Sequence, residues 1–94
     1  LRFDTSTRTL QCSQRKVALT AKEAELLGTL MRQPEAVFSR EHLVLKVWGS
    51  DSDIEPGNVD NYISFLRRRL RELGSACQIK TIYGTGYRLE ESHA

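Results

Sequence analysis

The chain has 94 residues, a formal net charge of +2, 39% hydrophobic residues and 28% charged residues. These values are typical of one ordinary soluble globular domain with a modest core, so we expect residues 1–94 to form a single domain. No apolar run approaches the roughly 18 residues that a membrane helix needs, and no signal-peptide pattern opens the sequence.

The sequence shows no residue pattern typical of a metal site or an enzyme. Cys12 and Cys77 lack the paired spacing of a zinc site or redox motif, and we expect inert thiols in a reducing cytoplasm, with a disulfide between them left open. His42 and His93 have no partners at ligand spacing, so a structural or solvent-exposed role is expected. Because no nucleophile–base set or paired carboxylates are evident, we expect no catalysis, no metal and no cofactor.

Charge is sorted along the second half of the chain. All charged residues between positions 51 and 60 are acidic, and nearly all of those between positions 67 and 88 are basic. Such a distribution presents one surface to a polyanion and keeps another surface away from it.

The first half of the chain predicts an antiparallel meander followed by two helices. Short strands separated by polar turns are expected at residues 1–4, 8–12 and 16–19. Thr20 and Glu23 form a capping box that begins a helix, and Pro34 ends it. A second helix is expected to begin at Ser39 and to end at Gly49.

A third helix, predicted at about residues 58–73, has an apolar stripe and a basic outer face. At 100° per residue its apolar positions fall in one stripe about 80° wide, and these positions are Val59, Ile63, Leu66, Leu70 and Leu73. The opposite side carries four residues, Asn61, Ser64, Phe65 and Arg68, and the flanks include Asn58, Arg67 and Arg69.

Two interpretations of this outer face stay open. A run of arginines on a helix is usually a solvated face, whereas the choice of arginine over lysine at every basic position favours bidentate recognition of phosphates or base edges. Phe65 favours contact with a partner such as a thymine methyl group, because an exposed aromatic ring is unfavourable in water. The alternatives are packing of Phe65 against the hairpin or the acidic loop, and a purely core role for Trp48.

A β-hairpin is predicted at about residues 78–90. Two strand-like segments flank Tyr83-Gly84-Thr85-Gly86, and two glycines between strands are typical of a hairpin turn. A phosphate-binding glycine loop is a weak alternative, since no helix follows. Strands, three helices of which the last is basic, and a hairpin wing give an α+β winged helix-turn-helix with an N-terminal antiparallel sheet. In such a fold the third helix enters the major groove of DNA and the wing lies near the minor groove.

Four ordered motifs resemble the effector domains of OmpR/PhoB-type response regulators over essentially the whole chain. They are LTAKEAELL, SREHL with VWG, NVDNYI with LRRRL, and IKTI with GTGYR. The resemblance implies a four-stranded N-terminal sheet and a bacterial, cytoplasmic transcription regulator. It further implies binding of double-stranded DNA at tandem half-sites, under the control of a phosphorelay whose receiver domain is absent from this chain.

The resemblance also implies which residues contact partners. The groove-facing candidates are Asn61, Tyr62, Ser64, Phe65 and Arg67. The other candidate DNA contacts are Trp48, Asn58, Arg68, Arg69, Thr81, Tyr83, Thr85 and Arg88. The loop at residues 49–57 is expected to contact an RNA polymerase subunit through its acidic side chains, Asp51, Asp53 and Glu55, which phosphates would repel.

The chain departs from the family pattern at three residues. Tyr83 stands where relatives often have an arginine that enters the minor groove, and Ser64 and Phe65 stand where some relatives have arginine. These departures leave a second hypothesis open, in which the fold serves as a protein-interaction module without nucleic acid.

Overall fold

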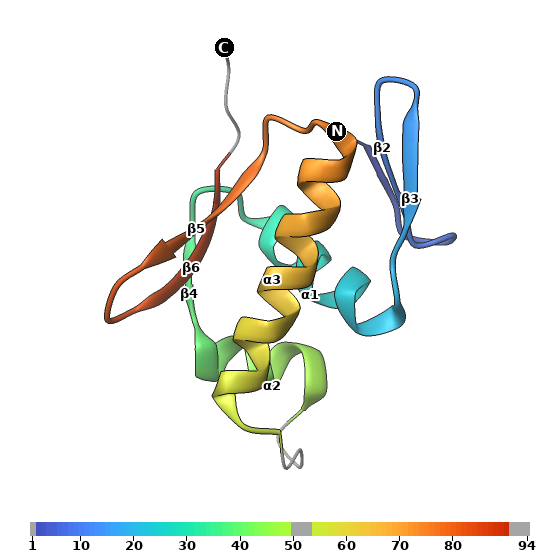
Figure 1. Cartoon of the computed structure of the whole chain (residues 1–94). Coiled ribbons are helices and arrows are strands. Elements are labelled where there is room, and N and C mark those ends of the chain that lie inside the picture. Colours follow the sequence, from blue (N-terminus) through green and yellow to red (C-terminus); the bar gives the residue numbers. More distant parts are fainter. Residues whose placement is uncertain (1, 50–53, 91–94) are drawn as a thin grey trace.

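A computed structural model describes residues 2–49 and 54–90 and shows three helices between two small antiparallel sheets (Figure 1). In chain order the elements are β1 (Arg2–Asp4), β2 (Thr9–Cys12), β3 (Arg15–Ala18), α1 (Ala21–Arg32), β4 (Val37–Ser39), α2 (Arg40–Trp48), α3 (Pro56–Leu73), β5 (Gln78–Ile82) and β6 (Gly86–Glu90). The predicted winged helix-turn-helix order is confirmed. No helix of the described residues is long and apolar enough to cross a membrane.

The helix ends follow from local capping interactions. The Thr20 side chain accepts a hydrogen bond from the Glu23 backbone N–H at 3.3 Å, and the Glu23 carboxylate accepts one from the Thr20 N–H at 2.9 Å. Ser39 Oγ accepts the His42 N–H at 3.0 Å at the start of α2. Gly74 ends α3 with φ of 68°, a left-handed conformation that glycine adopts without a steric penalty. The predicted capping box and the predicted start of α2 are therefore confirmed.

The N-terminal sheet and the start of α3 differ from expectation. Within the described residues the first sheet has three strands in the order β1-β2-β3, where the family resemblance implied four. Helix α3 begins at Pro56, two residues before the expected start, so Pro56 and Gly57 belong to the helix and not to the acidic loop. Proline suits a first helical turn because its fixed φ is helical and its missing N–H would be unpaired there. Asp51 and Asp53 lie outside the described residues.

Strand β4 was not predicted, and it extends the hairpin into a second three-stranded sheet. The sheet order is β4-β6-β5, and Phe38 lies opposite Tyr87 while Ser39 lies opposite Gly86. A Cβ atom added to Gly86 would lie only 1.9 Å from the backbone oxygen of Phe38. The close approach of β4 and β6 therefore requires glycine at this position.

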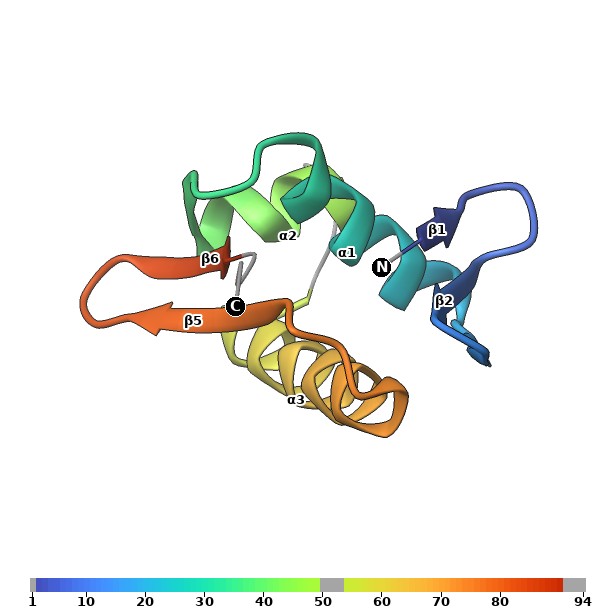
Figure 2. The same cartoon turned by 90° about the horizontal axis from the view of Figure 1, so that it is seen from above.

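The hydrophobic core lies between the three helices and the inner sides of both sheets. Its fully buried side chains include Leu10, Leu26, Leu27, Leu30, Leu43, Val59, Ile63, Leu66 and Leu89. All five residues of the apolar stripe predicted on α3 are buried, which confirms that stripe. Because the stripe faces α1 and α2, the opposite side of α3 points away from the body of the domain (Figure 2).

Candidate nucleic-acid interface

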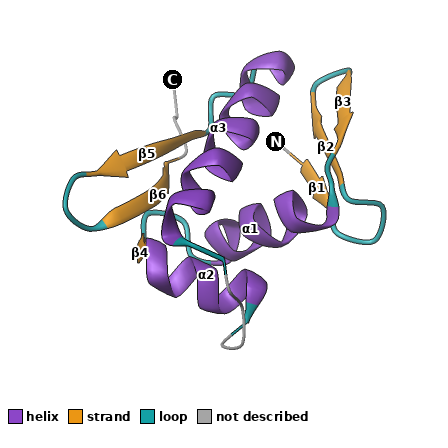
Figure 3. Cartoon of the chain, turned by 60° about the horizontal axis from the view of Figure 1, so that its bottom comes forward, coloured by secondary structure: helices purple, strands orange, loops and turns teal. Residues whose placement is uncertain are grey.

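The outer face of α3 consists of Asn61, Ser64, Phe65 and Arg68, and all four side chains are exposed. Their spacing of i, i+3, i+4 and i+7 places them on one side of the helix. Helix α2 packs beside α3, and the hairpin lies along one flank of α3 (Figure 3). Ser64 Oγ donates to the Asp60 carbonyl at 3.1 Å, whereas Asn61 and Arg68 make no side-chain hydrogen bond or ion pair within the described part of the chain. Their N–H groups are thus available to a partner.

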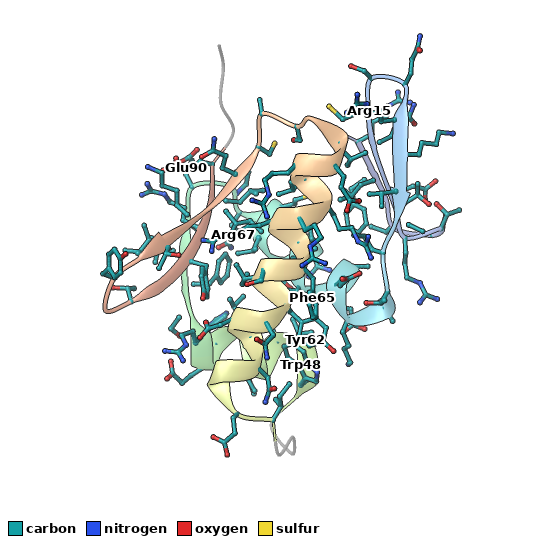
Figure 4. The ribbon with its side chains drawn as sticks, in the orientation of Figure 1. Arg15, Trp48, Tyr62, Phe65, Arg67 and Glu90 are labelled. Atoms are coloured by element: carbon teal, nitrogen blue, oxygen red, sulfur yellow. The ribbon has the colours of Figure 1, made fainter. Side chains whose placement is uncertain are left out.

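Arg67 has a different role from Arg68. Its guanidinium points to the hairpin (Figure 4) and donates from Nε and Nη2 to the Ile79 carbonyl, at 3.0 and 2.8 Å. Nη2 also donates to Thr81 Oγ1 at 2.8 Å, and the guanidinium carbon lies 5.7 Å from the centre of the Tyr87 ring. Three of the five N–H donors of Arg67 are therefore used to hold the wing against α3. Its orientation favours a positioning role over base reading.

Two further arginines expected to contact DNA form ion pairs within the domain. Arg69 is half-buried and lies 3.7 Å from a Glu72 carboxylate oxygen. Arg88 pairs with Glu90 through a short hydrogen bond and lies 3.8 Å from Glu35. Since neither guanidinium belongs to the outer face of α3, Arg68 is the arginine that this face presents.

A polar network joins α2, α3 and β6 at Asp60. The Tyr87 hydroxyl donates a short hydrogen bond to Asp60 Oδ1, and Arg40 Nη2 lies 3.3 Å from Asp60 Oδ2. Burial of the phenol, together with the neighbouring Asp60 carboxylate, raises the pKa of Tyr87 to about 12. Sequence reasoning missed this network, because it links residues up to 47 positions apart in chain order, from Arg40 to Tyr87.

An aromatic cluster lies on the flank of α3 away from the hairpin (Figure 4). The Trp48 and Tyr62 rings are 5.1 Å apart, and the Tyr62 and Phe65 rings are 5.8 Å apart, both in edge-to-face geometry. Trp48 and Tyr62 are half-buried and pack against the core, whereas Phe65 retains 43% exposure. Within the described residues the ring contact of Phe65 is thus with Tyr62 of its own helix, and no ring contact joins it to the hairpin there.

The tip of the wing is open to solvent. Tyr83 is 94% exposed and Thr85 is exposed, while the Thr85 N–H donates to the Ile82 carbonyl at 3.0 Å and closes the turn. The Thr81 hydroxyl accepts a hydrogen bond from Arg67, and its contact with DNA stays a prediction. Two predicted contacts lie near the start of α3, where Asn58 is half-buried and Glu55 is the exposed N-cap residue.

The described residues show no assembled metal-binding or redox site. No group of three or more His, Cys, Asp or Glu side chains is arranged there to hold a metal ion. Cys12 and Cys77 are both free and half-buried, so no disulfide joins them.

Comparisons with known proteins agree with this architecture. Residues 14–89 match the family model described as "Transcriptional regulatory protein, C terminal". The heme response regulator HssR of Staphylococcus aureus is 38% identical over 81 residues, covering 86% of this chain and 36% of that protein. The chain therefore spans about a third of the length of the curated relatives it matches.

Solved structures of DNA-binding domains have the same fold as this chain. The DNA-binding domain of the response regulator AdeR, in complex with an intercistronic region, matches with a TM-score of 0.83 and 30% identity, over 97% of this chain and 94% of that one. The DNA-binding domain of Bacillus subtilis CssR matches with a TM-score of 0.82 and 34% identity, over 94% and 97% of the two chains. This chain therefore belongs to the family of C-terminal transcriptional regulatory domains, a family of winged-helix regulators and not of enzymes.

Proposed function

We propose that this domain binds duplex DNA sequence-specifically and regulates transcription as the output domain of a bacterial response regulator. The observation that carries the proposal is the exposed outer face of α3, with the exposed wing tip beside it. A major groove about 12 Å wide admits one α-helix whose outer side is polar and cationic. The outer face of α3 meets that requirement, because the buried leucine stripe holds the helix while Asn61, Ser64 and Arg68 remain exposed.

Each exposed group has a distinct task in this proposal. Asn61 and Ser64 contact base edges, since amide and hydroxyl groups match the donors and acceptors of the major groove. Arg68 contacts a phosphate or a guanine, and the wing tip with Tyr83 and Thr85 lies at the adjacent minor groove. Four of the predicted DNA contacts are half-buried, and we assign them to the edge of this surface. They are Trp48, Asn58, Tyr62 and Arg69.

The proposal extends to the longer protein that the curated relatives imply. A receiver domain would lie outside this chain and control it through a phosphorelay, with two copies on tandem half-sites in the cytoplasm. The acidic segment that precedes α3 would contact an RNA polymerase subunit through Asp51, Asp53 and Glu55, of which Glu55 is exposed in the described structure. The domain itself would bind DNA without a cofactor or catalytic activity.

Selection of duplexes from a random DNA pool tests the proposal directly. We expect the wild-type domain to enrich a defined half-site, because base contacts from α3 distinguish the four base pairs. Asn61→Ala is expected to relax the selected sequence at one or two positions. Lys16→Ala is the matched control, since this exposed residue of β3 lies outside the proposed interface and its loss should leave the selected sequence unchanged. Absence of any enriched sequence with the wild-type domain would contradict the proposal.

A further inference from the structure

Phe65 is the large apolar side chain on the otherwise polar outer face of α3. Asn61 lies four residues before it and Arg68 three residues after it, and the ring is 43% exposed. An aromatic ring in this position keeps unfavourable contact with water until a partner covers it.

The aromatic cluster holds the Phe65 ring in place before any partner binds. The ring packs edge-to-face on Tyr62 at 5.8 Å with an interplanar angle of 71°, and Tyr62 packs in the same way on Trp48 at 5.1 Å. Edge-to-face is a preferred geometry of aromatic pairs. Helix α3 cannot rotate to bury Phe65, because Ile63 and Leu66 are fully buried on its opposite side. The exposed part of the ring is therefore a preformed contact surface.

We propose that Phe65 recognises the C5 methyl group of thymine in the major groove and thereby determines base specificity. This inference rests on the proposed function. In the major groove the thymine methyl is the apolar group by which one base pair differs from the others, and aromatic side chains are among those that contact it. Phe65 has no donor or acceptor, so apolar contact is the recognition it can provide.

Asn61 makes an A·T-containing site the natural target of this surface. An asparagine amide pairs with N6 and N7 of adenine, and the same A·T pair displays the thymine methyl in the major groove. Four residues of helix span about 6 Å along the axis, which is about two base-pair steps. Asn61 and Phe65 can thus contact two A·T pairs of one half-site that lie about two steps apart.

Replacement of single thymines by uracil tests the proposal, because it removes only the methyl group. The probe is the duplex that the wild-type domain selects from a random pool, with each thymine replaced in turn. At one or two positions we expect the wild-type affinity to fall about fourfold, the value of one buried methyl group. With Phe65→Ala the same replacements should have no effect, and Phe65→Leu should retain part of the effect because it keeps an apolar side chain.

Lys16→Ala is the matched control, since this exposed residue of β3 lies outside the proposed interface. It should leave the dependence on the methyl group intact. Equal uracil effects in the wild type and Phe65→Ala, or no uracil effect at any position, would overturn the role of Phe65 while leaving DNA binding established. A domain that selects no duplex would overturn the proposed function as well.

A measurement on the unmodified protein avoids any effect of substitution on folding. In the wild-type complex we expect nuclear Overhauser effects between Phe65 ring protons and a thymine methyl group, which require proximity of the two groups. An assigned spectrum of the complex without such a contact would overturn the proposal.

Discussion

The Arg67 guanidinium donates two hydrogen bonds to the carbonyl oxygen of Ile79, from Nε at 3.0 Å and from Nη2 at 2.8 Å. This pair connects α3 to the first strand of the wing. A second connection runs from α3 to β6 through Asp60 and the Tyr87 hydroxyl. The helix and the wing are therefore held as one unit, with their relative angle set before DNA is bound.

Arg67→Ala should destabilise the domain and weaken binding to all DNA sequences by a similar factor. Ile79 is 4% exposed, so its carbonyl loses a charged donor that water does not readily replace. The expected loss is about 1–3 kcal/mol in the free energy of unfolding, measured by urea denaturation. Arg68→Ala, an exposed neighbour on the same helix, should leave that free energy unchanged. A loss of affinity confined to one base pair would instead assign Arg67 to base reading.

Tyr87→Phe should remove a phenol whose pKa is raised well above its ordinary value. The pKa of Tyr87 is raised from 10.0 to about 12 in the folded state, because burial and the Asp60 carboxylate disfavour the phenolate. The resulting stabilisation is fully present below about pH 10 and is lost as the pH rises through about 12. In the native wild type, the tyrosinate absorbance of Tyr87 should therefore appear near pH 12. This absorbance change should be missing from Tyr87→Phe. Its appearance near pH 10 would contradict the network.

Gly86→Ala should disrupt the pairing of β4 with β6. The added Cβ would meet the Phe38 backbone oxygen at 1.9 Å, and backbone atoms cannot move aside as a flexible side chain can. We expect a loss above about 3 kcal/mol in the free energy of unfolding, or failure to fold. Gly57→Ala is the matched control, because nothing lies within 4 Å of a Cβ at that helical position, and alanine there should be neutral or stabilising by up to about 1 kcal/mol. Equal stability of the two variants would refute the close approach.

Binding of the domain to its selected duplex should weaken steeply with salt. Each phosphate contact contributes a slope of about 0.9 when log K is plotted against log salt concentration. Arg68→Ala should reduce that slope by about 0.9 if its guanidinium contacts a phosphate. Titrations between about 50 and 200 mM salt measure both values. A wild-type affinity that does not change over this range would be incompatible with a phosphate-contacting surface.

The helices were predictable from sequence because their signals are local. The capping box of Thr20 and Glu23 and the 3.6-residue period of the apolar stripe on α3 depend on neighbouring residues, and both are present in the structure. The outer face of α3 followed from the same period. Helical geometry alone was sufficient to place Asn61, Ser64 and Arg68 on it.

The contacts between distant segments were not predictable in this way. Strand β4 has three residues, too few for a recognisable alternation, and its partner β6 begins 47 positions beyond Ser39. Arg67 was correctly placed on a flank of α3, but sequence does not reveal that the hairpin carbonyls lie on that flank. Its assignment to the groove came from family resemblance, which transfers positions and not side-chain orientations.

Amide chemical shifts during titration with the selected duplex test the central claim most directly, since they report which surface the DNA covers. We predict the largest changes at Asn61, Ser64, Phe65 and Arg68 on α3 and at Thr85 in the wing, with β1, β2 and β3 unchanged. Changes confined to β1–β3, or no change at any residue, would contradict the account.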